Sequence, residues 1–156
     1  LSRGERWEWA LQKATELGVN EITPLFTARC EVKLNGDRLE KKLGHWRGII
    51  TSACEQSQRN RIPQLNAPKR FEELLNQEAS ELKLVLHHRS DKKINDYAAP
   101  QSACLLIGPE GGLSDNEIQQ AQQQDFHPLT LGPRVLRTET APLAALSALQ
   151  LTWGDF

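Results

Sequence analysis

The stretch ACLLIGPEGGLSDNEI, residues 103–118, decides the fold class, because it passes from an apolar strand through a glycine-containing loop into a helix. Residues 103–107 are apolar and have the length of a short strand. Ser114 is followed three residues later by Glu117, which is the capping-box spacing at the start of a helix. A strand, a loop and a helix in this order predict an α/β layer architecture.

The rest of the chain alternates helices and short strands in the same way. The spacing of apolar residues predicts helices over 7–17, 39–53, 70–76 and 141–153, and apolar runs predict strands over 21–26, 82–87 and 129–131. Pro24 limits the first strand to an edge or a strand end. There is no internal repeat or long linker, so we expect residues 1–156 to form one domain.

Composition narrows the class of protein. The chain has 156 residues, 38% hydrophobic and 25% charged, which is typical of a globular domain, and no apolar run approaches the about 20 residues that span a bilayer. Cys30, Cys54 and Cys104 are too widely spaced for a disulfide framework or a metal site, and they fit a reducing cytoplasm. The chain begins with Leu1 and contains no Met, so we expect it to be part of a longer protein.

Net charge limits how the chain can bind nucleic acid. The formal net charge is −1, whereas dedicated nucleic-acid binders are often strongly basic. If this domain contacts RNA, its basic residues must be gathered locally, or another domain must supply the affinity.

The loop GPEGG, Gly108–Gly112, is the first candidate ligand site. It follows a predicted strand, and ligands of open α/β sheets bind outside the carboxyl ends of the strands. Glycine lets the backbone approach a ligand closely, which suits a cofactor held by main-chain groups. The loop is not a phosphate-binding P-loop, because Leu113 and Ser114 stand where that motif has Lys and Ser or Thr. The alternative is a tight turn with no ligand.

The loop LGPRVLRTETA, residues 131–141, is the second candidate. Its two arginines, Arg134 and Arg137, could hold a phosphate, a carboxylate or a base edge, and the apolar pair between them could line a pocket. The alternative is a surface loop with an ion pair between Arg137 and Glu139.

The two loops together carry a family resemblance. LLIGPEGGLSDNEI and LGPRVLRTETAPLAALSALQ resemble the signature of the bacterial 16S rRNA uracil-N3 methyltransferase family, within the SPOUT class. The segments GERWEWALQKATELGV, ITPLFTARC and ACEQSQRNRIP match as well, in the same order, so the resemblance covers nearly the whole chain. Gln58 stands where the family commonly has Gly, which leaves the geometry of that turn open.

The resemblance implies a fold, a cofactor and partners. The fold is a SPOUT-type, mostly parallel sheet with helices on both faces and a deep C-terminal trefoil knot. The cofactor is S-adenosyl-L-methionine, and no metal is expected. The partners are 16S rRNA of the small ribosomal subunit and a second copy of the chain in a cytoplasmic homodimer. The PUA-like RNA-binding barrel at the N-terminus of full-length members has no counterpart in residues 1–156.

The resemblance also implies site residues. The implied cofactor-binding residues are Leu86, His87, Ile107, Gly108, Pro109, Glu110, Gly111, Gly112, Leu131, Gly132, Val135 and Leu136. The catalytic candidates are Arg137, Glu139, Glu55 and Arg59, and the RNA-binding candidates are Arg59, Asn60, Arg61 and Arg134. Glu55 could instead pair with Arg59 along one helix. His87 and His88 fit a strand end beside the pocket without a catalytic role.

Three functions remain to be distinguished. The first is a methyltransferase that modifies N3 of a uridine. The second is a non-catalytic RNA-binding or ribosome-assembly module on the same fold. The third, a nucleotide-phosphate hydrolase, is disfavoured because the sequence has no Lys-Ser/Thr loop and no evident acidic pair for magnesium.

Overall fold

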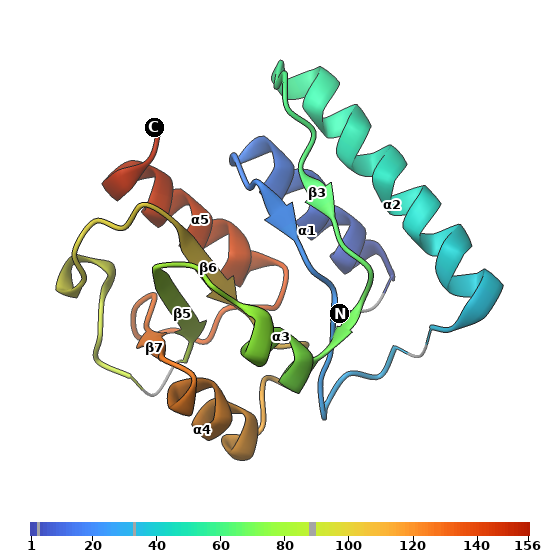
Figure 1. Cartoon of the computed structure of the whole chain (residues 1–156). Coiled ribbons are helices and arrows are strands. Elements are labelled where there is room, and N and C mark those ends of the chain that lie inside the picture. The colour runs from blue at the N-terminus through green and yellow to red at the C-terminus, as the bar shows by residue number, and fades with distance from the viewer. Residues whose placement is uncertain (3, 33, 88–89) are drawn as a thin grey trace.

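The strands of the protein pair in parallel. The computed structural model describes residues 1–2, 4–32, 34–87 and 90–156 (Figure 1). The helices are α1 (Gly4–Glu16), α2 (Gly36–Ser57), α3 (Phe71–Gln77), α4 (Asp115–Gln123) and α5 (Thr140–Trp153), with a 3-10 turn η1 (Ile94–Asp96). The strands are β1 (Glu21–Ile22), β2 (Leu25–Phe26), β3 (Gln64–Leu65), β4 (Lys69–Arg70), β5 (Leu82–Leu86), β6 (Ala103–Leu106) and β7 (Phe126–Leu129).

A three-stranded sheet in the order β6-β5-β7 forms the centre of the fold. Val85 of β5 is in register with Leu106, the last residue of β6, and Leu86 is in register with Leu129, the last residue of β7. The three strands therefore end at the same edge of the sheet. The loops that follow them begin side by side, although they are far apart in the sequence.

Helices cover both faces of this sheet, as the sequence predicts. Successive strand residues point to opposite faces. On one face, Val85 packs in a buried cluster with residues of α3 and α4. On the other face, Leu84 belongs to a cluster that includes Leu149 and Trp153 of α5. Leu84 and Val85 are fully buried, so β5 is apolar on both sides, as expected for the central strand of a parallel sheet.

The predicted strand over 21–26 is divided at Pro24. Its two halves, β1 and β2, pair with β3 and β4 respectively, which the sequence did not predict. Pro24 has no N–H for a strand ladder, but its carbonyl accepts a hydrogen bond from the Lys69 backbone N–H at 3.0 Å. Strands of two residues are too short to give a readable alternation, which explains why β3 and β4 were missed.

The strand predicted over 129–131 lies earlier than expected. It is β7, which includes Pro128. Proline in a strand favours an edge position, and β7 is an edge strand of its sheet, so the missing N–H removes no ladder bond there.

The segment after β7 is hydrogen-bonded to two earlier segments. The Thr130 backbone N–H donates to the Lys92 carbonyl at 2.8 Å, on the connection between β5 and β6. Eight residues later, the Thr138 hydroxyl donates to the Gly108 carbonyl at 2.9 Å, on the loop after β6. A C-terminal trefoil knot, which the resemblance implies, requires the last part of the chain to contact both of these segments.

A separate core joins α1 and α2. The rings of Trp7 and Trp46 meet edge to face with centroids 5.6 Å apart, beside buried Leu11, Leu43 and Ile50. This core attaches the first two helices to the sheet through the short strands β1 to β4.

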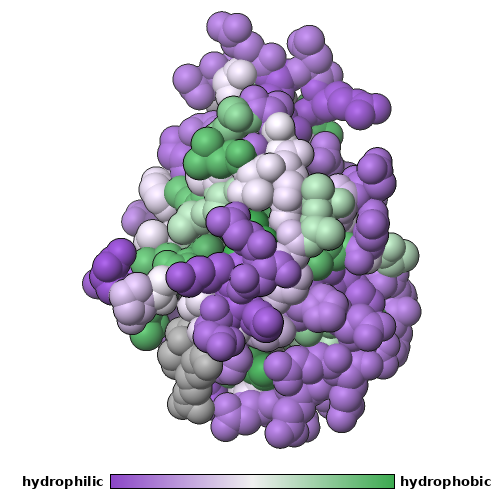
Figure 2. All heavy atoms as spheres, turned by 90° about the vertical axis from the view of Figure 1, so that its left-hand side faces the viewer, coloured by the Kyte–Doolittle hydropathy of each residue, from purple (hydrophilic) through white to green (hydrophobic). Residues whose placement is uncertain are grey.

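The last helix, α5, is apolar around most of its circumference. Ala145 is its only buried residue, whereas Leu151 is 69% exposed. Figure 2 shows apolar side chains gathered among hydrophilic ones on one side of the molecule, the left-hand side of Figure 1. Within the described residues, no helix has both the length and the apolar composition that crossing a bilayer requires.

Candidate functional site

The loops after β5, β6 and β7 meet around a pocket of about 590 Å³. All twelve residues that the sequence assigned to the cofactor line this pocket: Leu86, His87, Ile107, Gly108, Pro109, Glu110, Gly111, Gly112, Leu131, Gly132, Val135 and Leu136. Arg134, Arg137 and Glu139 line it too. The carboxyl edge of a parallel sheet thus brings together residues from three segments of the chain.

Glycines shape the loop after β6. A Cβ atom on Gly108 would lie 2.7 Å from the Leu113 backbone nitrogen and 2.9 Å from the Gly112 carbonyl carbon, so the loop closes on itself only with glycine at this position. Gly112 has a φ of +69°, in the left-handed region. The Gly112 N–H donates to the Pro109 carbonyl at 2.8 Å and closes a tight turn.

The wall of the pocket combines apolar side chains with exposed main chain. Leu86, Ile107, Leu131 and Leu136 are each partly buried where they line it. Gly132, with a φ of +103° on the second loop, has no atom within 4 Å of the place where a Cβ would stand. A flat apolar group with polar edges fits such a wall, because peptide N–H and C=O groups can reach its edges without intervening side chains.

Charged side chains gather at the rim of the pocket. Arg6 of α1 lies 3.7 Å from a carboxylate oxygen of Glu110 and 4.0 Å from Oε1 of Glu139. The other oxygen of Glu139, Oε2, is buried and makes no hydrogen bond to the described part of the chain. Arg137 is exposed, and its carbonyl accepts the N–H groups of Thr140 and Ala141 at the start of α5. Among the described residues, Glu139 therefore pairs with Arg6 and not with Arg137, the partner that the surface-loop alternative expected.

Among the lining residues that were not sequence candidates are two arginines, Arg6 and Arg29. Both come from the first thirty residues, far from the two loops in sequence. Arg29 lies in the ITPLFTARC segment, whose place in the resemblance was the only signal that could have pointed to it.

The paired histidines are only partly described. His87 lines the pocket, and its backbone N–H donates to the Leu129 carbonyl at 3.0 Å, which continues the pairing of β5 with β7. His88 lies outside the described residues. Across the four described ranges, no group of three or more His, Cys, Asp or Glu side chains is arranged to hold a metal ion.

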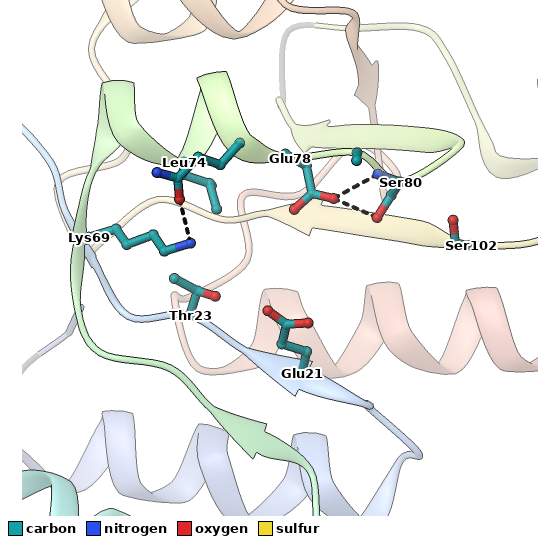
Figure 3. A pocket seen from close by; sticks show the side chains of 9 residues that line it. Glu21, Thr23, Lys69, Leu74, Glu78, Ser80 and Ser102 are labelled. Atoms are coloured by element: carbon teal, nitrogen blue, oxygen red, sulfur yellow. Dashed lines mark hydrogen bonds between the residues drawn. The ribbon is translucent and has the colours of Figure 1, made fainter.

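A second, smaller pocket of about 320 Å³ lies at the opposite edge of the sheet (Figure 3). Its residues Glu78, Ser80 and Ser102 precede β5 and β6, at the amino ends of the strands. Several of its polar groups already bond to one another, as Ser80 does through its hydroxyl to Glu78 at 2.6 Å. Ligands of open α/β sheets bind at the carboxyl edge, so the larger pocket is the better candidate.

Burial, charge and hydrogen bonds together shift the pKa of two groups at the smaller pocket. Burial alone would raise the pKa of Glu78, but hydrogen bonds from Ser80, Cys104 and the Ala79 backbone outweigh burial and lower it. Burial, and then the Glu78 carboxylate, raise the pKa of the Cys104 thiol. Cys104 therefore stays protonated and donates to Glu78, which is a structural role.

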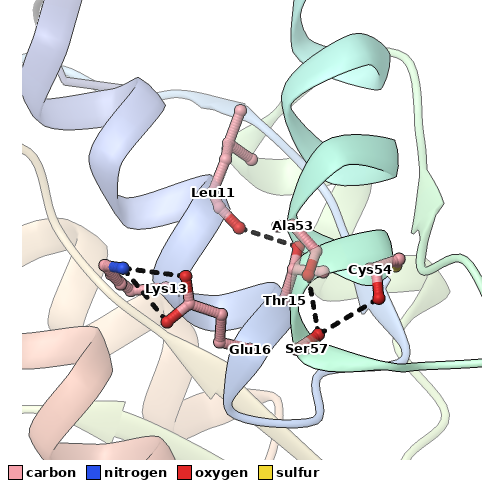
Figure 4. A network of polar contacts seen from close by, with 7 residues as sticks. All are labelled: Leu11, Lys13, Thr15, Glu16, Ala53, Cys54 and Ser57. Carbon is pink, nitrogen blue, oxygen red and sulfur yellow. Dashed lines mark hydrogen bonds and ion pairs between the residues drawn. The ribbon is translucent and has the colours of Figure 1, made fainter.

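The remaining sequence candidates lie away from the larger pocket, at the end of α2. None of Glu55, Arg59, Asn60 and Arg61 lines it. This end of α2 packs against α1, where the hydroxyls of Thr15 and Ser57 bond back to carbonyls of their own helices (Figure 4).

Arg59 has a structural partner at this packing contact. Its guanidinium donates to the Thr15 carbonyl at 2.6 Å, near the end of α1. Glu55, Asn60 and Arg61 are exposed. The structure therefore does not bring Glu55 or Arg59 to the pocket of their own chain. Their catalytic roles stay predictions, and they would require these residues to reach the pocket of a second copy.

Comparison with known proteins identifies the family. The sequence model described as "RNA methyltransferase domain" matches residues 1–150. The chain belongs to this family. Ribosomal RNA small subunit methyltransferase E of Mesomycoplasma hyopneumoniae is 45% identical over 94% of the chain and 65% of its own length. The enzyme of the same name from Bacillus subtilis is 40% identical over 99% of the chain and 66% of its own length.

Two solved structures share the fold of the whole chain. A methyltransferase of Legionella pneumophila, solved with bound SAM, superposes with a TM-score of 0.97 at 48% identity and covers 100% of the chain. Ribosomal RNA small subunit methyltransferase E of Neisseria gonorrhoeae, bound to S-adenosyl methionine, gives 0.94 at 43% identity over 100% of the chain. The chain covers 65% of each of these proteins. The SPOUT-type α/β fold that the resemblance implied is confirmed.

Proposed function

We propose that residues 1–156 form the catalytic domain of an S-adenosylmethionine-dependent methyltransferase that acts on N3 of a uridine in 16S rRNA. One observation carries the proposal: the two glycine-containing loops follow β6 and β7, the parallel strands on either side of β5, and all twelve expected cofactor residues line one pocket there. Family membership and two relatives solved with S-adenosylmethionine support the same assignment.

The pocket fits this cofactor chemically. The partly buried side chains of Leu86, Ile107 and Leu131 offer an apolar slot for an adenine ring, and the glycines leave peptide groups accessible to its edge. Carboxylate and guanidinium groups at the rim can bind the ammonium and carboxylate of an amino-acid moiety. When bound, S-adenosylmethionine supplies an electrophilic methyl group on a sulfonium.

The chain's own residues would manage the proton of the uracil. Methylation of N3 requires its proton to leave, and Glu139 has a buried carboxylate oxygen, Oε2, that is not engaged by the described residues and can accept it. Arg137, exposed on the pocket lining, would stabilise negative charge on the uracil oxygens. Arg134, also exposed there, would contact the phosphate backbone of the RNA.

Calorimetry and a methylation assay test this function. S-adenosylmethionine should bind the chain, and the protein that contains this domain should transfer a labelled methyl group to N3 of a single uridine in small ribosomal subunits. Arg137→Ala and Glu139→Gln should each reduce transfer by ~10²-fold or more with little change in the melting temperature. Binding without transfer to any RNA would favour the non-catalytic RNA-binding or assembly module. Absence of cofactor binding would contradict the proposal.

We further propose that the chain acts as a cytoplasmic homodimer. The apolar surface of α5, with Leu151 69% exposed, supports a subunit contact, and the three unpaired cysteines agree with a reducing compartment. A dimer also offers a way for the exposed Glu55 and Arg61 to reach a pocket, namely that of the second subunit. Sedimentation analysis should give twice the mass of the chain, and Leu151→Lys should shift it toward the monomer.

A further inference from the structure

Ala28 and Arg29, which lie between β2 and α2, form hydrogen bonds to the loop after β6 and to the helix α4 that follows it. The Arg29 guanidinium donates to the Gly111 carbonyl at 2.8 Å and, at a longer 3.4 Å, to the Leu113 carbonyl. The Ala28 backbone N–H donates to Oε1 of Glu117 at 2.8 Å. A segment of the first thirty residues is thus bonded to a loop more than 80 positions later.

These bonds hold one peptide group of the loop from both sides. The carbonyl of the peptide between Gly111 and Gly112 binds Arg29, and its N–H donates to the Pro109 carbonyl at 2.8 Å. Rotation of this peptide would break both bonds together. A charged donor on one side also polarises the peptide and strengthens the bond on the other.

The peptide between Leu113 and Ser114 is held in the same manner. Its carbonyl faces Arg29, and its N–H donates to Oε2 of Glu117 at 2.8 Å. Glu117 is 5% exposed, and its second carboxylate oxygen, Oε1, accepts a hydrogen bond from the Ala28 backbone N–H. The hydrogen bonds therefore close a ring that joins the capping box of α4 to the segment that carries Arg29.

The stem of Arg29 also packs against the loop. A Cβ atom on Gly111 would have the Arg29 side chain as its three nearest neighbours, with Cβ at 3.2 Å and Cδ at 3.4 Å. Gly111 is not among the residues with positive φ, so a side chain at this position would strain no backbone angle. Its only close conflict is with Arg29.

We propose that Arg29 is a positioning residue that fixes the 108–113 loop for the methyl donor. The inference rests on the proposed function, because it assigns the purpose of the loop to cofactor binding. Arg29 lines the pocket and holds two carbonyls of the loop, which keeps the peptide groups of that loop in one orientation. A flexible loop would have to be ordered each time the cofactor binds, which would lower the affinity.

Titration calorimetry with S-adenosylmethionine tests the role of Arg29. Arg29→Ala should raise the Kd by roughly five- to tenfold, because an exposed charged donor is lost. Arg29→Lys should give an intermediate Kd, and Arg47→Ala, at an exposed arginine of α2, should match the unaltered protein. Hydrogen exchange should become faster at the Gly112 and Ser114 amides in Arg29→Ala. An unchanged Kd in Arg29→Ala would overturn the inference, whereas failure of the unaltered protein to bind would overturn the proposed function instead.

A double-mutant cycle separates positioning from a general loss of packing. Gly111→Ala alone should raise the Kd, since the new methyl group displaces the Arg29 stem. In the Arg29→Ala background, the same change should raise the Kd less, because Cγ and Cδ of Arg29 are gone and only its Cβ remains near the new methyl group. Additive effects of the two substitutions would overturn the inference.

Discussion

Thr138 and Gly108 are joined by a hydrogen bond that links the two loops of the candidate site. The hydroxyl of Thr138 donates to the Gly108 carbonyl at 2.9 Å, across a separation of 30 residues. The two loops follow different strands, β7 and β6, and this bond fixes the distance between them at the wall of the pocket. The width available to a ligand therefore depends on a side chain that does not itself have to touch the ligand.

Thr138→Val should weaken cofactor binding more than it weakens folding. Valine keeps the shape of threonine but removes the donor, which leaves the Gly108 carbonyl without this bond. We expect the Kd for S-adenosylmethionine to rise roughly five- to tenfold and the free energy of unfolding to fall by about 1 kcal/mol. Calorimetry and urea unfolding measure the two quantities. Thr138→Ser, which keeps the hydroxyl, is the control, and equal affinity in both variants would contradict the expectation.

Gly108→Ala should disrupt the loop after β6. The added Cβ would lie 2.7 Å and 2.9 Å from backbone atoms of the same loop, which cannot move aside as a flexible side chain does. We expect loss of measurable cofactor binding. Gly48→Ala is the matched control, because Gly48 lies within α2 with nothing near its Cβ position, and it should stabilise the protein by about 0.5–1 kcal/mol. Normal binding by Gly108→Ala would show that the loop rearranges without cost to the pocket.

The two glycine-containing loops could be predicted as candidates because ligands of open α/β sheets bind at the carboxyl ends of the strands, and the family resemblance supplied the individual cofactor residues. The structure shows β5 and β6 paired in parallel, so the loops after them are neighbours, but no pattern in the sequence predicts this strand order. The side chains that reach this edge from elsewhere could not be predicted in this way. Arg6 and Arg29 arrive through the packing of the first thirty residues on the sheet, and no local pattern encodes that contact.

The prediction of secondary structure was wrong where the strands are shortest. The capping box of Ser114 and Glu117 is present as predicted, with bonds in both directions. Helices of several turns repeat their apolar pattern often enough to be recognised. The strands β3 and β4 have two residues each, which is too few for an alternation of apolar and polar residues to repeat. They are recognised as strands only by their pairing with β1 and β2.

Gln58→Gly should stabilise the protein. Gln58 ends α2 in the left-handed region, with φ of 60° and ψ of 30°, where a side chain is strained and glycine is not. This geometry explains why the family commonly has glycine here. We expect the free energy of unfolding to rise by about 0.5–1 kcal/mol, less than the full strain because glycine also gains freedom in the unfolded chain. Urea unfolding provides the measurement, and a loss of stability would contradict the expectation.

Arg59→Ala and Arg61→Ala should differ in their effect on folding. Arg59 donates to the Thr15 carbonyl at 2.6 Å, so its removal should lower the free energy of unfolding by about 1 kcal/mol. Arg61 is exposed, and its removal should leave stability within about 0.5 kcal/mol. If both contribute to RNA binding, both should weaken it in a filter assay, and only Arg59→Ala should also melt at a lower temperature. Equal stability of the two variants would contradict a structural role for Arg59.

The stability that Glu78 contributes should be lost in acid. Hydrogen bonds from Ser80 and Cys104 hold the pKa of Glu78 below the ordinary value of 4.5, against the opposing effect of burial. A carboxyl whose pKa is lower in the folded state contributes stability that is fully present above the unfolded pKa and is lost as the pH falls through the folded pKa.

The variant Glu78→Gln isolates this contribution. It should be less stable than the unaltered protein at about pH 7, and the difference should shrink as the pH falls below the ordinary pKa value of 4.5, because protonation removes the same charge from the unaltered protein. Urea unfolding at several pH values measures the difference. Glu40→Gln, at an exposed position of α2, controls for the change in net charge. A difference between Glu78→Gln and the unaltered protein that stays constant across this range would show that the charge of Glu78 does not contribute to acid sensitivity.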